Sequence, residues 1–449
     1  MTADLVLTNA KAYVNKEIVD CSLAIDRGKI FKIGKETTMP KAEVKTDLKN
    51  LLVLPGLIDV HVHLRDQGKA YKEDFHTGTA AAAAGGITTV LDMPNNNPVT
   101  MSVATLRERI RTAEKKILVN VGFYSEFPAS MNVIGAIAEE GAVAFKLFMA
   151  EQIGGLDIDD DYALLEAFQT ISNLKLLVAV HAEDKKDLEK SRSELEKANR
   201  DDVNAYLKAH SENVEAKAMK RLLKIVEKTK VRIHFCHVST ENGLKTIMDG
   251  KKAGLPVTCE VTPHHLLLSA GDFRSVGTLA LTTPPVREER HIKALWNGVK
   301  NGWVDIIASD HAPHALKEKK ADSIWNVKAG VPGLETMLPL LLTEVNRGSL
   351  TIADVVRLTS ERPAEIFNLK ENGSLREGGN ADLTVVDLKR KYKIVASRFF
   401  SKAKHSPFDG WEARGKPVKT FVLGKLIMDY GEIVAKAGSG RIIRRGAAS

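Results

Sequence analysis

Eight short apolar segments of strand-like length recur through the middle of the sequence, and helical patterns separate most of them. One such pattern places Leu106, Ile110 and Ala113 on a single face, as in an amphipathic helix. Alternating strands and helices predict a parallel sheet. Eight right-handed repeats predict an α/β fold with a closed (β/α)8 TIM-type barrel. The segments are residues 57–62, 87–93, 118–123, 142–148, 175–181, 231–237, 256–261 and 304–309.

The two ends of the chain have a different pattern from its middle. Residues 1–54 and 379–449 contain short apolar runs broken by Asn, Asp and Gly, which is typical of strands joined by turns. We therefore expect both ends to pair in one composite small β-sandwich domain. The barrel domain is expected to span residues 55–378.

Two further segments are expected to lie on the surface. Residues 184–215 are rich in charge and predict a helical excursion from the barrel. The tail from residue 436 onward carries a basic cluster, Arg441, Arg444 and Arg445, and is expected to be flexible and solvated.

Composition excludes several classes of function. The net charge is +8, but the basic residues are scattered and aromatic content is only 6%, so no basic–aromatic stripe for nucleic acid is present. Cys21, Cys236 and Cys259 form no CxxC pair, which argues against a disulfide framework and suits a reducing, cytoplasmic compartment. No apolar run reaches the roughly 18 residues of a membrane span. We expect a small-molecule substrate, with neither nucleic acid nor membrane as partner.

Polar residues occur where the predicted strands end. In a barrel these ends form one face, so residues distant in sequence converge there. His61 and His63 point to the same side of their strand, because side chains alternate. Imidazoles with a carboxylate suit Zn²⁺ or a similar divalent ion, and the sequence predicts a metal site. The polar residues at the strand ends are His61, His63, Asp92, Asn95, Lys146, His181, His237 and Asp310, and the four histidines with Asp310 form the ligand set.

Lys146 lies inside an apolar strand, where a lone ammonium group is costly. Three interpretations remain open at this point. The side chain could extend to the barrel mouth, or pair with a carboxylate. Alternatively, burial could lower its pKa so that it reacts with CO₂ and forms a carbamate able to bridge two metal ions.

Several motifs together resemble the amidohydrolase superfamily, and most closely its dihydroorotases. They are HVHLR at 61–65, EDFHTGTAAAAAGGITTVLDMPN at 73–95, FKLF at 145–148, HAED at 181–184, HVST at 237–240, SDHAPH at 309–314 and GGNADLTVVD at 378–387. The resemblance covers nearly the whole chain. It implies zinc-dependent, reversible cyclisation of N-carbamoyl-L-aspartate to L-dihydroorotate in pyrimidine (UMP) biosynthesis.

The resemblance also implies residue roles. His61 and His63 would bind a first Zn²⁺, and His181 and His237 a second, with carboxylated Lys146 and a hydroxide bridging the two. Asp310 would ligate metal and shuttle the proton as the catalytic residue. Arg65, Asn95 and His314 would hold the substrate carboxylate, although Arg65 could instead pair with Glu73 or Asp74.

Two positions depart from the dihydroorotase pattern. Thr283 stands before Pro284-Pro285 where an asparagine that contacts substrate is common, and a threonine hydroxyl has a shorter reach. Asp66-Gln67-Gly68 replaces the usual Glu-Pro-Gly. Both changes leave the predicted metal site intact and bear on the choice of substrate.

Alternatives within and beyond this class stay open. An allantoinase, hydantoinase or dihydropyrimidinase would share fold and metal chemistry, but its neutral ring offers Arg65 no carboxylate. A non-catalytic scaffold partner of aspartate carbamoyltransferase would not need the complete ligand set. A homodimer is the default expectation, and association of an active enzyme with aspartate carbamoyltransferase is compatible with the sequence.

Overall fold

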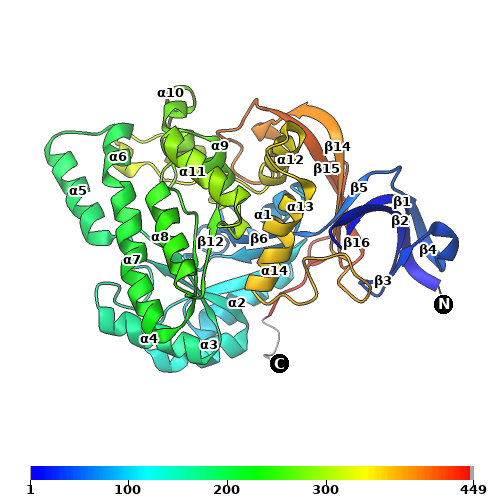
Figure 1. The fold of residues 1–449 in the computed structure, drawn as a ribbon, viewed down its shortest axis with the longest axis horizontal. Coiled ribbons are helices and arrows are strands. Elements are labelled where there is room, and N and C mark those ends of the chain that lie inside the picture. The colour runs from blue at the N-terminus through cyan, green and yellow to red at the C-terminus, as the bar shows by residue number, and fades with distance from the viewer. Residues whose placement is uncertain (1, 445–449) are drawn as a thin grey trace.

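The computed structural model describes residues 2–444, which form two sheets surrounded by helices (Figure 1). The first sheet joins eight parallel strands in chain order, and a bridge between Val62 and His311 links its two ends. The predicted (β/α)8 barrel is therefore confirmed. Its strands are β6 (Leu57–Val62), β7 (Ile87–Asp92), β8 (Asn120–Glu126), β9 (Ala142–Phe148), β10 (Leu177–His181), β11 (Arg232–Phe235), β12 (Val257–Val261) and β13 (Ile306–Ile307).

Helices cover the outside of this sheet (Figure 1). Many begin at a side chain that accepts a hydrogen bond from a backbone N–H of the first turn, as Asp74 does for Thr77. None of the helices within residues 2–444 is long and apolar enough to cross a membrane. The helices are α1 (Phe75–Ala84), α2 (Val103–Glu114), α3 (Ile134–Glu140), α4 (Asp161–Asn173), α7 (Glu212–Thr229), α8 (Glu241–Lys252), α9 (Pro263–Leu267), α10 (Phe273–Val276), α11 (Glu289–Lys300), α12 (Met337–Arg347), α13 (Ile352–Val356) and α14 (Arg362–Ile366).

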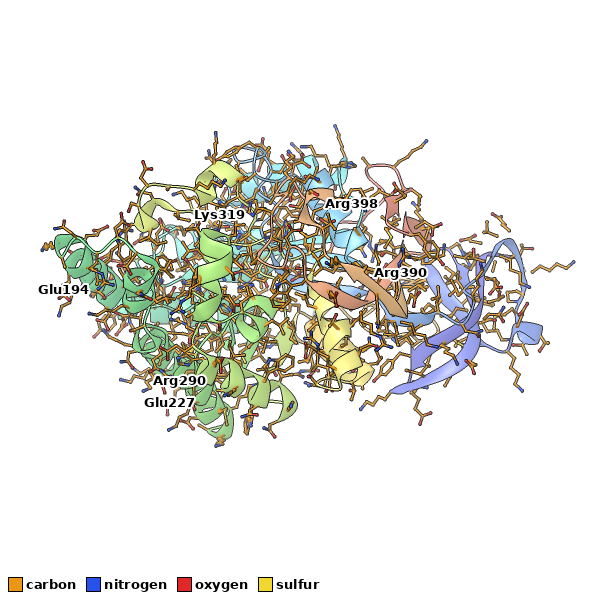
Figure 2. The ribbon with its side chains drawn as sticks, turned by 90° about the horizontal axis from the view of Figure 1, so that it is seen from above. Glu194, Glu227, Arg290, Lys319, Arg390 and Arg398 are labelled. Carbon is orange, nitrogen blue, oxygen red and sulfur yellow. The ribbon has the colours of Figure 1, made fainter. Side chains whose placement is uncertain are left out.

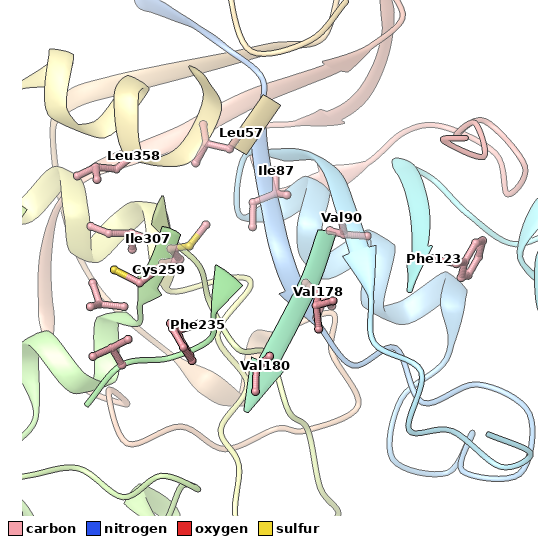
Figure 3. Close-up of a cluster of buried hydrophobic side chains, with 14 of the residues drawn as sticks. Leu57, Ile87, Val90, Phe123, Val178, Val180, Phe235, Cys259, Ile307 and Leu358 are labelled. Carbon is pink, nitrogen blue, oxygen red and sulfur yellow. The ribbon is translucent and has the colours of Figure 1, made fainter. Parts of the chain in front are cut away.

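Alternating strand residues build two apolar layers. Residues such as Leu57, Val90 and Phe235 belong to the large cluster between strands and helices (Figure 3). Ile58 and Leu91 belong to a separate cluster that fills the barrel interior. This division follows from the two-residue period of a strand. The packed interior leaves chemistry to the strand ends.

The second sheet contains strands from both ends of the chain, as predicted. The strands of the two chain ends are joined by the antiparallel pairing of β5 with β14, in which Val53 faces Val385. Eight of the sheet's nine strands follow one hydrogen-bonded path, and β4 pairs with β1 outside that path. The nine strands are β1 (Thr2–Val14), β2 (Glu17–Asp26), β3 (Lys29–Gly34), β4 (Lys41–Asp47), β5 (Leu52–Pro55), β14 (Leu383–Lys393), β15 (Glu412–Val422), β16 (Lys425–Asp429) and β17 (Glu432–Ile433).

The charged excursion is helical, as predicted. It contains α5 (Lys185–Lys197) and α6 (Val203–Ala209). In Figure 1, α5 lies at the end of the molecule opposite to the terminal sheet, and Figure 2 shows Glu194 of α5 at the same end. The helix α6 carries buried Tyr206 and Ala209, so the inner face of the excursion packs on the barrel side.

The prediction of a flexible tail is wrong for residues 436–444, and residues 445–449, including Arg445, lie outside the described residues. The Val121 N–H donates to Arg441 O at 2.9 Å, and the Ile443 N–H donates to Val121 O at 2.8 Å. Ile443 is buried and joins the cluster inside the barrel. The physical reason is the apolar Ile442-Ile443 pair, which the basic residues around it obscured.

Candidate functional site

His61, His63 and Asp310 converge at the carboxyl ends of β6 and β13. Asp310 Oδ1 lies 3.3 Å from His61 Nε2 and 3.4 Å from His63 Nε2. All three residues are buried, and their ligand atoms lie within 4.8 Å of one another. Two imidazole nitrogens and a carboxylate oxygen at this spacing fit a divalent metal ion.

His181 and His237 form the neighbouring half of the cluster. His181 Nδ1 is 3.0 Å from His237 Nε2, and both side chains are buried. The His237 ring centroid lies 5.2 Å from that of His61, which connects the two halves. The fold thus brings together the four histidines and the aspartate, which the sequence placed at the ends of four strands.

Lys146 is fully buried in β9. Its ammonium group donates to Cys236 Sγ at 2.9 Å and lies 5.0 Å from the Phe148 ring centroid. No carboxylate among residues 2–444 lies within ion-pair distance of it, although its positive charge acts against the rise that burial causes in the pKa of Glu126.

Three of the histidines are oriented through their second ring nitrogen. The Nδ1–H of His61 donates to Glu260, that of His63 donates to Asn95 Oδ1 at 2.8 Å, and the Nε2–H of His181 donates to Glu183 Oε2 at 2.8 Å. Such partners fix the ring and its tautomer, which leaves the other nitrogen for the metal. The orienting roles of Glu183 and Glu260 were not predicted from the sequence. The acidic residue two positions after His181 in the HAED motif could have indicated Glu183.

The pKa shifts of the clustered histidines differ in direction: burial lowers the pKa of His63 to about 3 and holds that of His237 well below its usual value. Burial opposes a charged imidazole, but Asp310 and Glu260 outweigh it and raise the pKa of His61 to about 10. Burial would likewise raise the pKa of Asp310, yet His61 and the hydrogen bond from His63 hold it well below its usual value. A divalent cation would supply positive charge beside Asp310 without a second proton on His61, so the site suits one.

Three residues of the candidate site have a left-handed backbone conformation. Arg65, His237 and Asp310 have φ angles of 60°, 35° and 45°, in the left-handed region that residues with side chains seldom adopt. Each such residue costs about 1–3 kcal/mol, and such strain is typical of functional sites. The three predicted site residues are therefore held in conformations that local preference does not explain.

Arg65 is buried beside His63, and its guanidinium forms no hydrogen bond to any residue within 2–444. Its Nε is both buried and without a partner. Burial lowers its pKa to about 10. The alternative pairing with Glu73 or Asp74 is not formed, because Glu73 accepts from the Ser401 hydroxyl and Asp74 caps α1.

Asn95 and His314, the other predicted carboxylate-binding residues, already have protein partners. Asn95 uses its oxygen for His63, which leaves its NH₂ group as a donor. His314 Nδ1 accepts from Lys72 Nζ at 3.0 Å, and its Nε2–H donates to Ala329 O at 3.1 Å. Lys72 is thus a second cation near this region that the sequence did not single out.

The comparisons with known proteins agree with this geometry. Residues 52–427 match the model of the amidohydrolase family. The chain is 38% identical to a dihydroorotase of Methanothermobacter thermautotrophicus over 98% of this chain and 97% of that protein. It is 39% identical to a dihydroorotase of Pyrococcus horikoshii over 99% and 96% of the two chains. Among solved structures, an L-hydantoinase (dihydropyrimidinase) from Arthrobacter aurescens is similar with a TM-score of 0.95 and 30% identity, over 99% of this chain and 100% of that one.

Proposed function

The chain belongs to the amidohydrolase family, and we propose that within it the protein acts as a dihydroorotase, a metal-dependent hydrolase of a cyclic amide. The reaction interconverts L-dihydroorotate and N-carbamoyl-L-aspartate, and pyrimidine biosynthesis uses the ring-closing direction. Full-length similarity to dihydroorotases supports this assignment. A non-catalytic scaffold would not need these residues, and the proximity of His61 and His63 to Asp310 and of His181 to His237 supports the enzyme instead.

The observation that carries the choice of substrate is the buried Nε of Arg65, which has no hydrogen-bond partner. Leaving a buried donor of a cation unpaired is costly unless a ligand accepts from it. The planar fork of arginine binds a carboxylate through two parallel hydrogen bonds. Dihydroorotate carries such a carboxylate, whereas hydantoin, dihydrouracil and allantoin are neutral rings. We assign the NH₂ group of Asn95 as an additional donor to the same carboxylate.

The residues of the cluster would share the chemistry as follows. A bound divalent metal ion polarises the ring carbonyl and makes water a nucleophile near neutral pH. Asp310 accepts the proton of the attacking water and returns it to the ring nitrogen that leaves. The second layer of Glu183, Glu260 and Asn95 keeps the histidine rings in the tautomer that this arrangement requires.

We further propose Zn²⁺ as the ion, two ions at full occupancy, and a carbamate on Lys146. The support is chemical: imidazole-rich sets suit Zn²⁺, and a carbamate turns a buried cation into an anion able to bridge two cations. A homodimer, association with aspartate carbamoyltransferase and a cytoplasmic location stay predictions.

A hydantoinase or dihydropyrimidinase is the second candidate. The specific observations in its favour are the L-hydantoinase structure with a TM-score of 0.95 and the presence of Thr283 where dihydroorotases commonly have asparagine. Against it stands Arg65, because a neutral ring leaves the guanidinium without a partner.

A direct comparison of substrates tests the proposal. The zinc-loaded protein would be assayed for hydrolysis of dihydroorotate, dihydrouracil, hydantoin and allantoin, with kcat/KM measured for each. We expect a clear preference for dihydroorotate, loss of activity with a chelator, and recovery when zinc is restored. Preference for a neutral ring would contradict the dihydroorotase assignment, and chelator resistance would contradict the metal site.

A further inference from the structure

The loop of residues 281–287 is held beside the candidate site by its backbone. The buried ammonium of Lys319 (labelled in Figure 2) donates to Leu281 O at 3.1 Å and to Gly330 O at 2.9 Å. The Gly330 N–H donates to Leu281 O at 2.8 Å. Gly330 also packs on His314, since a Cβ at Gly330 would lie 3.2 Å from the His314 ring. The loop backbone is therefore fixed next to the predicted carboxylate site.

Thr283 is the residue of this loop at the usual asparagine position. Its hydroxyl oxygen lies 2.5 Å from the hydroxyl oxygen of Tyr206, which comes from α6 of the excursion. The Tyr206 hydroxyl also donates toward Thr282 O at 3.2 Å. Tyr206 is buried while Thr283 is half-buried, so the tyrosine contacts the threonine from the protein side. Thr283 keeps part of its surface exposed, and its loop lies next to His314.

The protons of this group can be counted. Two hydroxyl protons are available for three oxygens, those of Tyr206, Thr283 and the Thr282 carbonyl. If Tyr206 donates to Thr283, the Thr283 proton is free to donate to a ligand. If Tyr206 donates to Thr282 O, Thr283 donates to Tyr206 and presents its lone pairs as an acceptor. In both arrangements Tyr206 takes up one hydrogen-bonding position of the Thr283 hydroxyl, which restricts the positions left for a ligand.

Tyr206 packs against His210, and His210 is linked through Glu183 to the predicted metal ligand His181. Its ring centroid lies 4.2 Å from that of His210. The His210 Nδ1–H donates to Glu183 Oε1 at 2.8 Å, and the other oxygen of Glu183 accepts from His181. The excursion therefore contacts both the metal cluster and the loop that carries Thr283.

We propose that Tyr206 is a specificity-determining positioning residue, which fixes the Thr283 hydroxyl so that it hydrogen-bonds the pyrimidine ring of dihydroorotate. This inference rests on the dihydroorotase function proposed above. An asparagine amide reaches further than a threonine hydroxyl. Tyr206 compensates by fixing the direction of the shorter group, so that less conformational freedom is lost on binding.

The experiment measures kcat and KM for dihydroorotate in the zinc-loaded full chain. Its variants are Tyr206→Phe, Thr283→Val, their double variant, and Thr283→Ser. We expect Tyr206→Phe to raise KM about 3- to 10-fold, the range of one neutral hydrogen bond, with kcat changed less than about twofold. The double variant should be no worse than Thr283→Val, because Tyr206 acts only through Thr283. Thr283→Ser should retain a KM near that of the unaltered protein.

Tyr13→Phe is the matched control, because it removes the hydroxyl of another buried tyrosine, in β1 of the terminal sheet. It should leave KM unchanged. An unchanged KM in Tyr206→Phe, additive losses in the double variant, or a Thr283→Ser variant as weak as Thr283→Val would each overturn the inference. Absence of dihydroorotate turnover in the unaltered protein would overturn the proposed function as well, so the two failures are distinguishable.

Discussion

Glu183 offers a sharp test of how the metal cluster is held. It is fully buried, and its two oxygens accept from His181 Nε2 and His210 Nδ1, each at 2.8 Å. Burial would raise its pKa, but the two histidines hold it well below its usual value, so it is a carboxylate. Glu183→Gln keeps the shape but offers one acceptor and one NH₂ group. The amide therefore cannot accept from both histidines.

The expected loss follows from this geometry. If the NH₂ group faces His181, its ring takes the other tautomer, and its proton then lies on Nδ1, the nitrogen that faces His237. Loss of such an orienting partner typically costs about 10- to 100-fold in metal affinity, or about 1.4–2.8 kcal/mol at 1.4 kcal/mol per tenfold. His210→Asn leaves the contact between Glu183 and His181 in place. We expect it to cost less than about threefold.

The assay is the apparent Kd for Zn²⁺, measured by competition with a chromophoric chelator. Circular dichroism would establish that both variants retain the fold. An unchanged Kd in Glu183→Gln would refute the orienting role. A loss in His210→Asn as large as that in Glu183→Gln would show that the excursion as a whole, rather than the bond to His181, maintains the site.

Three further predictions concern single residues. Asp310→Asn should keep the fold and lower kcat about 10²- to 10⁴-fold, the range of a lost acid–base group; near-normal turnover in steady-state assays would contradict the proton transfer. Arg65→Lys should lower kcat/KM for dihydroorotate about 10- to 100-fold, because one ammonium cannot replace a bidentate fork; an unchanged value would mean that Arg65 does not bind the carboxylate. Burial raises the pKa of Glu335 to about 8, although the N–H groups of Phe400 and Ser401 donate to it. The folded chain thus holds a proton that the unfolded chain releases, so stability should fall as pH rises from about 4.5 to 8. Glu335→Gln should weaken this fall, and identical pH dependence of thermal unfolding in both proteins would count against the shift.

The barrel could be predicted because each of its strands is marked by a short apolar segment of adjacent residues. Each of the eight apolar segments overlaps a strand, and the ligand residues stand at strand ends whose convergence is a property of the barrel. The orienting layer could not be predicted in the same way. Glu183 follows a strand end, but its second partner, His210, lies in a segment whose charge indicated only a surface excursion. Which acceptor a buried histidine meets depends on tertiary packing.

The residues expected to bind substrate were also predictable only where their position in the sequence, rather than tertiary packing, identified them. Arg65 was predicted from its position after His63, and its unpartnered guanidinium fits that prediction. By contrast, no pattern in the sequence connects Thr283 with Tyr206 or His314 with Lys72, since each pair comes from separate loops or helices. The docking of Ile443 under the barrel was also missed, because a short apolar pair among basic residues carries little periodicity.

The pairing of β5 with β14 has a consequence for biosynthesis. Strand β5 leaves the ribosome before any barrel strand, but the partner for its second edge is residues 383–386. At about 5–20 residues per second, synthesis from residue 55 to residue 383 takes roughly 16 to 66 seconds. Throughout this interval β5 presents an open strand edge, a surface to which other nascent chains can add. The terminal sheet is begun first and completed last, so the window for misassembly is set by the time needed to synthesise the whole barrel.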